Sequence, residues 1–289
     1  MKQFFVSAVI WFGIISSGWA ATVDTVQVFS EAMQRDIRAV IITPQTYIAE
    51  EGQRFPVVYL LHGYSGNYAD WITKAPKIQA LADHYQLILV CPDGGYNSWY
   101  LDSPVQPASQ YETHVAREVV GFVDSTYRTQ AQPNGRAITG LSMGGHGALS
   151  LAIRHSDTFG AAGSMSGGVD LTYNVDNWEI KDQLGAYEEN PLRWDSLSVV
   201  NMVPDLSPNQ LALIIDCGTD DFFFRINQQL HQTLLELEIP HDYIMRPGAH
   251  NWPYWSNAVE YQLLFFANFF EENGLTGTPS SATDQEYGQ

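Results

Sequence analysis

Residues 140–144, Gly-Leu-Ser-Met-Gly, match the G-x-S-x-G pattern of a nucleophile elbow. An elbow is a tight strand-to-helix turn that exposes a serine hydroxyl, and its glycines let the strand and the helix approach closely. A strand-like run, 136–139, precedes the motif, and a helix-forming run, 145–154, follows it. The pattern predicts that Ser142 is a nucleophile; a glycine-rich helix start without chemistry is the alternative.

A serine hydroxyl needs a base to take its proton and an acid to orient that base. His250 ends a loop directly after a predicted strand and follows the serine in chain order, so we predict that it is the base. The acid is expected in the loop after strand 211–215, where Asp220 and Asp221 are neighbours. Spacing does not choose between them, and capping of the helix that begins near Phe223 explains either one.

The tetrahedral intermediate of such a reaction needs two backbone N–H donors for its oxyanion. We predict that one donor is the N–H of Met143, directly after the nucleophile. The other should come from the glycine-containing loop at 62–66, which follows strand 55–61. An ordinary strand-ending turn is the alternative for that loop.

Strands and helices alternate along the chain, and they must place these residues. Strands are predicted at 22–30, 38–43, 55–61, 87–90, 136–141, 161–165, 211–215 and 243–245, and helices at 70–85, 111–127, 145–154, 223–237 and 255–270. The first two strands read as an antiparallel edge pair. The rest predicts an α/β fold, a mostly parallel sheet with helices on both faces. Two insertions, 94–110 and 169–208, interrupt this pattern.

The two ends of the chain differ from the domain predicted at 21–272. Residues 1–20 have one lysine, an apolar run and a small residue at Ala20, the layout of a signal peptide and of an exported, periplasmic or secreted protein. A membrane anchor is the alternative, but the apolar run is shorter than a span needs. No later segment predicts a span. Residues 273–289 are rich in Gly, Ser, Thr and Pro and predict a disordered tail.

Composition excludes several kinds of partner and cofactor. The formal net charge is −18, from 14 Lys and Arg against 32 Asp and Glu, which argues against nucleic acid as a partner. No metal-binding or nucleotide-binding motif is found, so we expect no cofactor. Cys91 and Cys217 each end a predicted strand, and the fold places three strands between them, so we predict two buried free thiols. No pattern indicates an oligomeric state.

The chain resembles the esterase D branch of the α/β hydrolases, which includes S-formylglutathione hydrolases, feruloyl and acetyl-xylan esterases, tributyrin esterases and mycolyltransferases. The resemblance covers about 30–270 and rests on Ser-Glu-Ala-Met at 30–33, Leu-Leu-His-Gly at 60–63, Pro-Asp-Gly at 92–94, Gly-Leu-Ser-Met-Gly-Gly at 140–145, Gly-Thr-Asp-Asp at 218–221 and Gly-Ala-His at 248–250. It implies the α/β-hydrolase fold, Asp221 as the acid and the Tyr64 N–H as the second oxyanion donor. A signal peptide argues against the cytosolic glutathione thioesters as substrates.

Six aromatic residues are candidates for the walls of a substrate pocket, although core positions explain each of them equally well. They are Trp99, Tyr100, Trp178, Trp194, Trp252 and Trp255. We take Trp99, Tyr100 and Trp252 as the pocket residues, and Trp252 and Trp255 as the nearest to His250.

The function expected from these features is an exported serine esterase that acts on short-chain or carbohydrate esters through an acyl-enzyme. The first alternative is an acyltransferase of the same fold that passes the acyl group to a sugar or another alcohol. The second is a carbohydrate-binding module without catalysis, against which the complete Ser, His and Asp set argues. The sequence does not indicate which acyl or alcohol group is preferred.

Overall fold

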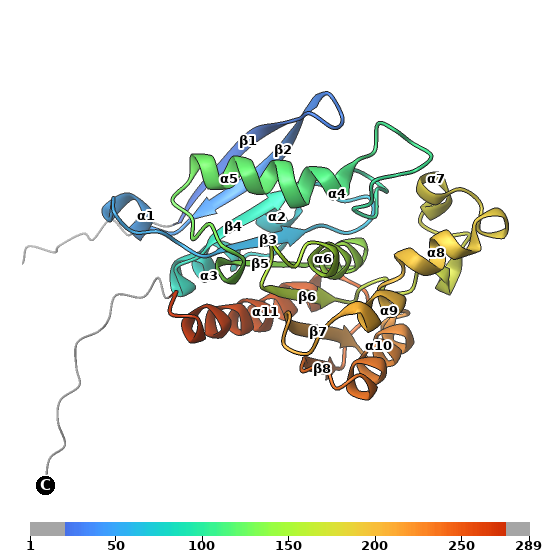
Figure 1. The fold of residues 1–289 in the computed structure, drawn as a ribbon. Helices are drawn as coiled ribbons and strands as arrows, with labels where there is room; N and C mark the ends of the chain where they lie inside the picture. Colours follow the sequence, from blue (N-terminus) through green and yellow to red (C-terminus); the bar gives the residue numbers. More distant parts are fainter. Residues whose placement is uncertain (1–20, 276–289) are drawn as a thin grey trace, which may run out of the picture.

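The computed structural model describes residues 21–275, and eight strands of this range form one sheet (Figure 1). The predicted signal peptide and residues 276–289 of the predicted tail lie outside the described residues. The strands are β1 (Thr22–Ser30), β2 (Arg35–Thr43), β3 (Val57–Leu61), β4 (Ile88–Pro92), β5 (Arg136–Gly140), β6 (Ala161–Met165), β7 (Ala212–Gly218) and β8 (Asp242–Arg246).

The sheet has the order β1-β2-β4-β3-β5-β6-β7-β8. The β1–β2 and β2–β4 pairs are antiparallel, and all the other pairs are parallel. The mostly parallel sheet with an antiparallel edge pair is therefore confirmed. Because β3, β5, β7 and β8 are parallel, their carboxyl ends meet at one edge of the sheet, where the predicted site residues follow them.

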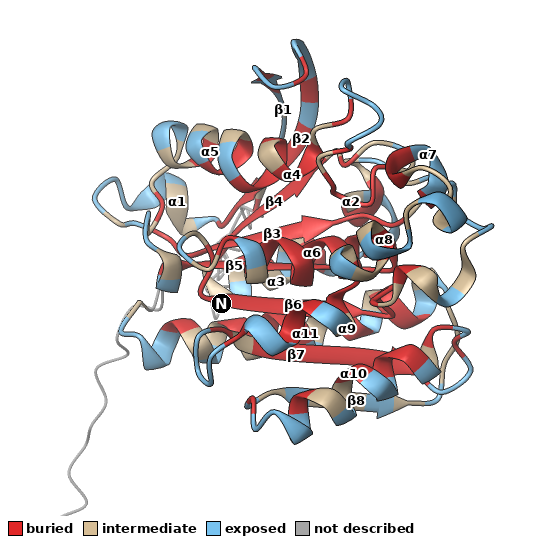
Figure 2. Cartoon of the chain, turned by 45° about the vertical axis from the view of Figure 1, so that its right-hand side comes forward, coloured by how far each residue is buried: buried red, intermediate tan, exposed pale blue. Residues whose placement is uncertain are grey.

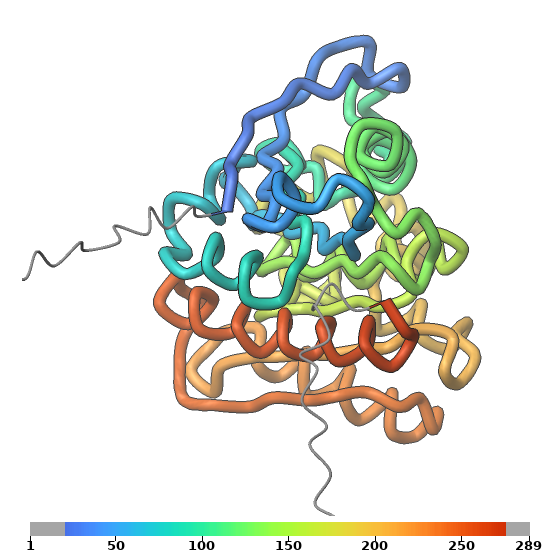
Figure 3. The backbone as a smooth tube through the Cα atoms, turned by 90° about the vertical axis from the view of Figure 1, so that its left-hand side faces the viewer, coloured from blue at the N-terminus to red at the C-terminus, as the bar shows by residue number. Residues whose placement is uncertain are grey.

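Helices cover both faces of the sheet, which explains why the central strands are buried from end to end (Figure 2). Successive residues of β3 alternate between two cores: Val57, Tyr59 and Leu61 pack on one face, and Val58 and Leu60 on the other. The first face carries α5 (Val120–Thr126), α6 (Met143–Arg154) and α10 (Phe224–Glu236). The second carries α3 (Ile78–Tyr85) and α11 (Trp252–Glu272), which lie side by side (Figure 3).

The segment 70–85 differs from its prediction, because it forms two helices where one was expected. The first is α2 (Asp70–Lys74), and α3 begins at Ile78. Pro76 lies between them, and a proline has no N–H to donate to the helix and clashes with the preceding turn. The Trp71 indole of α2 donates to the Leu61 carbonyl at the end of β3 at 3.2 Å, so α2 lies beside the predicted oxyanion loop.

The remaining helices belong to loops and insertions. The segment from α4 (Tyr111–Thr113) runs into α5 through one π-helical stretch, His114–Val119. A short helix, α1 (Thr46–Ala49), follows β2. The insertion at 169–208 carries α7 (Ile180–Leu184), α8 (Pro191–Leu197) and α9 (Val199–Met202). Cys91 lies on β4 and Cys217 on β7, both buried and free, as predicted.

Candidate active site

Ser142 lies in a sharp turn between β5 and α6, with φ 55° and ψ −116°. A non-glycine residue adopts such a backbone only under strain, which the packing around the turn maintains. A Cβ at Gly140 would lie 2.5 Å from the Gly144 carbonyl oxygen, and a Cβ at Gly144 would lie 2.6 Å from the carbonyl oxygens of Leu61 and His62. Both glycines of the motif are therefore required for α6 to pack against the end of β3.

A continuous chain of hydrogen bonds joins three side chains at this edge of the sheet. Nε2 of His250 lies 2.9 Å from Oγ of Ser142, and Nδ1 of His250 lies 2.8 Å from Oδ2 of Asp221. A carboxylate only accepts hydrogen bonds, so Nδ1 carries the proton and Nε2 is free to accept the serine hydroxyl proton. The arrangement is that of a serine activated by an oriented base.

The two candidate acids lie in different environments. The Asp221 carboxylate is fully buried and also accepts a hydrogen bond from the N–H of Phe223 at 2.8 Å. Asp220 is exposed. The structure thus places Asp221, as the family resemblance implies, and not Asp220, against the histidine.

The loops that carry the acid and the base are joined by backbone hydrogen bonds. The N–H of Thr219 donates to the Arg246 carbonyl at 2.8 Å, and the N–H of Asp220 donates to the Gly248 carbonyl at 2.9 Å. Gly248 has φ +153°, and a Cβ there would lie 2.1 Å from the Tyr254 ring. These contacts fix the direction in which the chain enters His250.

The predicted oxyanion loop faces the serine. A Cβ at Gly63 would lie 2.7 Å from Cδ1 of Leu141, so the loop packs directly on the elbow. Among the hydrogen bonds of the described residues, neither the Tyr64 N–H nor the Met143 N–H has an acceptor. Both donors are therefore available to an incoming oxyanion.

The ring of His62 holds this loop in place. Its Nδ1 lies 2.8 Å from the Gly63 carbonyl, and its Nε2 accepts from the Gly94 N–H at 2.8 Å. The buried Tyr100 hydroxyl donates to the His62 carbonyl at 3.0 Å. Burial raises the pKa of the Asp93 carboxyl, but the neighbouring His62 ring and a hydrogen bond from the Gly95 N–H at 2.8 Å outweigh it, and the net pKa lies below its usual value.

Neither cysteine competes with Ser142 as a nucleophile. Burial raises the pKa of both thiols, Cys91 and Cys217, well above the usual range. The thiolate is the reactive form, so both stay unreactive thiols at neutral pH.

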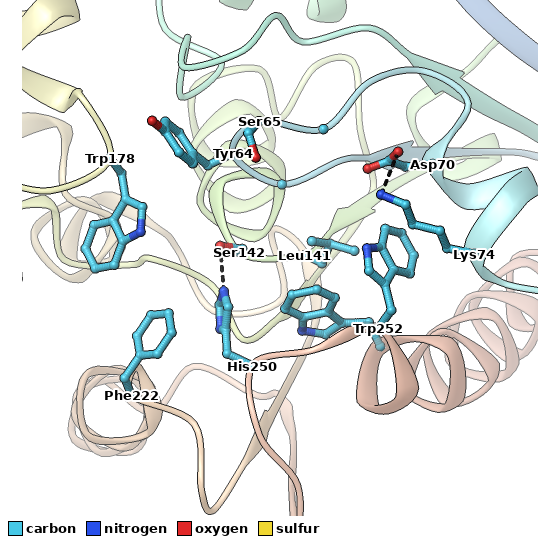
Figure 4. A pocket seen from close by; sticks show the side chains of 13 residues that line it. Tyr64, Ser65, Asp70, Lys74, Leu141, Ser142, Trp178, Phe222, His250 and Trp252 are labelled. Carbon is cyan, nitrogen blue, oxygen red and sulfur yellow. Dashed lines mark hydrogen bonds and ion pairs between the residues drawn. The ribbon is translucent and has the colours of Figure 1, made fainter.

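A cavity of about 220 Å³ opens above Ser142 (Figure 4). Three of the six aromatic candidates line it: Trp178, Trp252 and Trp255. The prediction was wrong for Trp99 and Tyr100, which are 2% and 0% exposed and belong to the core. Both lie on the loop after β4, which packs against the 169–208 insertion: the Trp99 indole donates a hydrogen bond to the Trp178 carbonyl at 3.2 Å. Trp194 is also buried in the core.

Other cavity residues were missed by the sequence reasoning. Phe222 packs against the His250 ring, with 4.2 Å between centroids and 36° between the ring planes, and its position directly after the acid was the available signal. Asp70 and Lys74 line the opposite wall and form an ion pair at 2.9 Å. Their i,i+4 spacing after the oxyanion loop is typical of a helix surface pair and by itself indicates no site.

Two further features bear on cofactors and membranes. Within residues 21–275, no group of three or more His, Cys, Asp or Glu side chains lies close enough to hold a metal ion. None of the helices in the same range combines the length and the apolar character that a membrane span requires.

Known proteins are similar to this chain in sequence and in fold. A family model described as a putative esterase matches residues 30–266. The acetyl esterase of Caldicellulosiruptor saccharolyticus is 27% identical over 235 residues, which is 76% of this chain and 84% of that protein. A solved ferulic acid esterase has a TM-score of 0.74 at 28% identity and covers 87% of this chain and 100% of its own. Diacylglycerol acyltransferase/mycolyltransferase Ag85A of Mycobacterium tuberculosis is 33% identical over 158 residues, 51% of this chain and 44% of that protein.

Proposed function

Because this chain belongs to the putative esterase family, has the α/β-hydrolase fold and is a carboxylic ester hydrolase, we propose that it cleaves esters through a serine acyl-enzyme. Ser142 is the nucleophile, His250 the general base and acid, and Asp221 the group that orients the histidine. The observation that carries the proposal is the unbroken chain from the serine hydroxyl through the imidazole to a buried carboxylate, with distances of 2.9 and 2.8 Å.

In the first half of the reaction, Oγ of Ser142 attacks the ester carbonyl carbon while its proton passes to Nε2 of His250. The carbonyl oxygen becomes an oxyanion, which the N–H groups of Tyr64 and Met143 bind. Asp221 stabilises the imidazolium that forms. The bond to the alcohol oxygen then breaks, that oxygen takes the proton from Nε2, and the alcohol leaves.

In the second half, His250 takes a proton from water, whose oxygen attacks the acyl carbon. The second oxyanion forms in the same place, and its collapse returns the proton to Oγ of Ser142 and releases the acid. Removal of one oxyanion donor in such sites costs about 2.7–4 kcal/mol of barrier. Met143 and Tyr64 act through the main chain, so substitutions that keep the backbone conformation leave this contribution intact.

The proposed substrates are short-chain esters or acylated carbohydrates, and the proposed location is outside the cytoplasm. The similarity to an acetyl esterase and to a ferulic acid esterase supports the first statement. The signal-peptide layout of residues 1–20 supports the second. Mass spectrometry of the chain recovered from intact cells tests the location: cleavage after Ala20 supports export, and an uncleaved leader in the cytosolic fraction contradicts it.

The test of the mechanism uses purified protein with p-nitrophenyl acetate, ethyl acetate and an acetylated sugar as substrates. Ser142→Ala should remove turnover of all three, because the Ser142 hydroxyl is the one that lies against the base among residues 21–275, and its thermal unfolding should match that of the unchanged chain. The unchanged chain should also form a covalent adduct with a serine-directed fluorophosphonate, and the variant should not. Turnover that persists in the variant would contradict the mechanism.

Acyl transfer to an alcohol is a second candidate, favoured by the 33% identity to Ag85A. The acyl-enzyme is the same for both reactions, and the difference is whether water or an alcohol attacks it. We propose hydrolysis as the main reaction, because the other relatives reported above are esterases. The ratio of transfer product to free acid, measured with added glucose, separates the two.

A further inference from the structure

The cavity above Ser142 has two chemically different walls, which Figure 4 shows on opposite sides of the serine. One wall is aromatic: the ring planes of Trp178 and Phe222 lie within 17° of parallel, with centroids 5.7 Å apart. The other wall contains Asp70 and Lys74 of α2 together with Trp252 of α11. An ester whose two ends differ in polarity would be oriented by such a pair of walls.

One oxygen of the Asp70 carboxylate, Oδ2, accepts no hydrogen bond from the residues that the structure describes. The residue is 5% exposed, and its Oδ1 receives the Lys74 ammonium at 2.9 Å. Among the interactions of the described residues, no donor to Oδ2 is found, and this oxygen packs against Gly66, which also lines the cavity. Because Asp70 lines the cavity, this oxygen can accept a hydrogen bond from a hydroxyl group of a ligand, and a hydrogen bond to a charged group is stronger than one between neutral groups.

Lys74 is held over the same wall. Its Nζ lies 5.1 Å from the centre of the Trp252 ring, a cation–π contact, and the side chain is 44% exposed. The Trp252 ring in turn meets Trp71 edge-on at 5.3 Å, which fixes its orientation. An ammonium has three donors, so the ion pair with Asp70 leaves donors free for an oxygen in the cavity.

We propose that Asp70 and Lys74 form a subsite for the alcohol portion of the ester when that portion carries hydroxyl groups, as a sugar does. One hydroxyl donates to Oδ2 of Asp70, and a neighbouring oxygen accepts from Nζ of Lys74. The apolar acyl group then lies toward Trp178 and Phe222. This inference rests on the proposed acyl-enzyme mechanism, because only that mechanism separates an acyl end from an alcohol end.

The test compares two acetates that give the same acetyl-enzyme: ethyl acetate, which has no hydroxyl group, and the acetyl ester of methyl glucoside. Since deacylation is identical for both, the ratio of their kcat/KM values reports only binding and acylation. The ratio should favour the sugar ester in the unchanged chain. Asp70→Asn and Lys74→Met should each lower it about tenfold or more, the size of a lost hydrogen bond to a charged group.

Lys77→Met is the matched control. Lys77 also belongs to an ion pair, with Glu260 at 2.9 Å, but it does not line the cavity, so this variant should leave the ratio unchanged. Thermal unfolding is measured for each variant; should Asp70→Asn fail to fold, Lys74→Met still tests the same subsite from an exposed position. An unchanged ratio in Lys74→Met, or no preference for the sugar ester in the unchanged chain, would overturn the subsite. Failure of the mechanism itself would appear separately, as turnover of both acetates by Ser142→Ala.

Discussion

Replacing Asp221 by Asn should nearly abolish turnover while leaving the fold intact. The carboxylate accepts two hydrogen bonds, from Nδ1 of His250 and from the N–H of Phe223 at 2.8 Å. Asparagine has the same shape but only one acceptor oxygen. If that oxygen keeps the backbone N–H, the amide NH₂ faces Nδ1 and forces it to act as an acceptor. The ring proton then resides on Nε2, where it blocks acceptance of the Ser142 proton.

The size of the effect follows from the loss of the correct tautomer together with the loss of the charge that stabilises the imidazolium. The same change in another serine hydrolase lowers kcat by about 10⁴. A factor of 10⁴ corresponds to about 5.4 kcal/mol of barrier. We expect a similar loss here, because the Asp221 carboxylate is fully buried and water cannot replace it.

The assay is kcat/KM with p-nitrophenyl acetate, and Asp220→Asn is the matched control. Asp220 is exposed and adjacent in the chain, so its variant makes the same chemical change in the same loop and should keep kcat/KM within about twofold. Both variants should show cooperative thermal unfolding. A loss of less than tenfold in Asp221→Asn, or a larger loss in Asp220→Asn, would refute the assignment of the acid.

Three further predictions concern packing, pH and the aromatic wall. Gly144→Ala should destabilise the chain by about 1–3 kcal/mol in urea unfolding, because the added Cβ would lie 2.6 Å from backbone oxygens. Gly121→Ala in α5 is the control: no atom lies within 4 Å of its added Cβ, so this variant should be neutral or stabilising, and equal effects of the two variants would contradict the packing argument. Burial lowers the pKa of His114 and His146 below the ordinary 6.5, so near and below that pH the unfolded chain binds protons that the folded chain does not. The free energy of unfolding should therefore fall as the pH is lowered through 6.5; a flat profile would contradict it. Phe222→Ala should lower kcat/KM for ethyl benzoate relative to ethyl acetate about three- to tenfold, through the lost aromatic contact, and an unchanged ratio would remove Phe222 from the acyl wall.

Sequence reasoning placed the serine, the histidine and the sheet because each leaves a one-dimensional signal. A glycine-flanked serine between strand and helix, and a histidine after a strand, have few alternatives in this fold. Asp220 and Asp221 have no such signal: they are neighbours in one turn, and only the turn geometry decides which side chain enters the protein.

The pocket could not be predicted for a related reason. Trp99 and Trp178 both lie in irregular segments, where no periodicity distinguishes a buried side chain from one that lines a cavity. One turned out to pack beneath the other, with 6.5 Å between ring centroids. The i,i+4 spacing of Asp70 and Lys74 predicts a pair on a helix surface, and nothing in the sequence indicates that this surface lines a cavity.

The hydrogen bonds between the loops after β7 and β8 affect how the substrate preference of such an enzyme can change. The hydrogen bonds from Thr219 and Asp220 bind the acid and base loops into one unit, and the serine turn is locked to β3 by its glycines. Each substrate wall combines a residue next to the acid or the base, Phe222 or Trp252, with residues of another segment, Trp178 of the 169–208 insertion or Asp70 and Lys74 of α2. Evolution or an engineer can therefore exchange those segments, and with them the preferred ester, while the reaction centre is inherited unaltered.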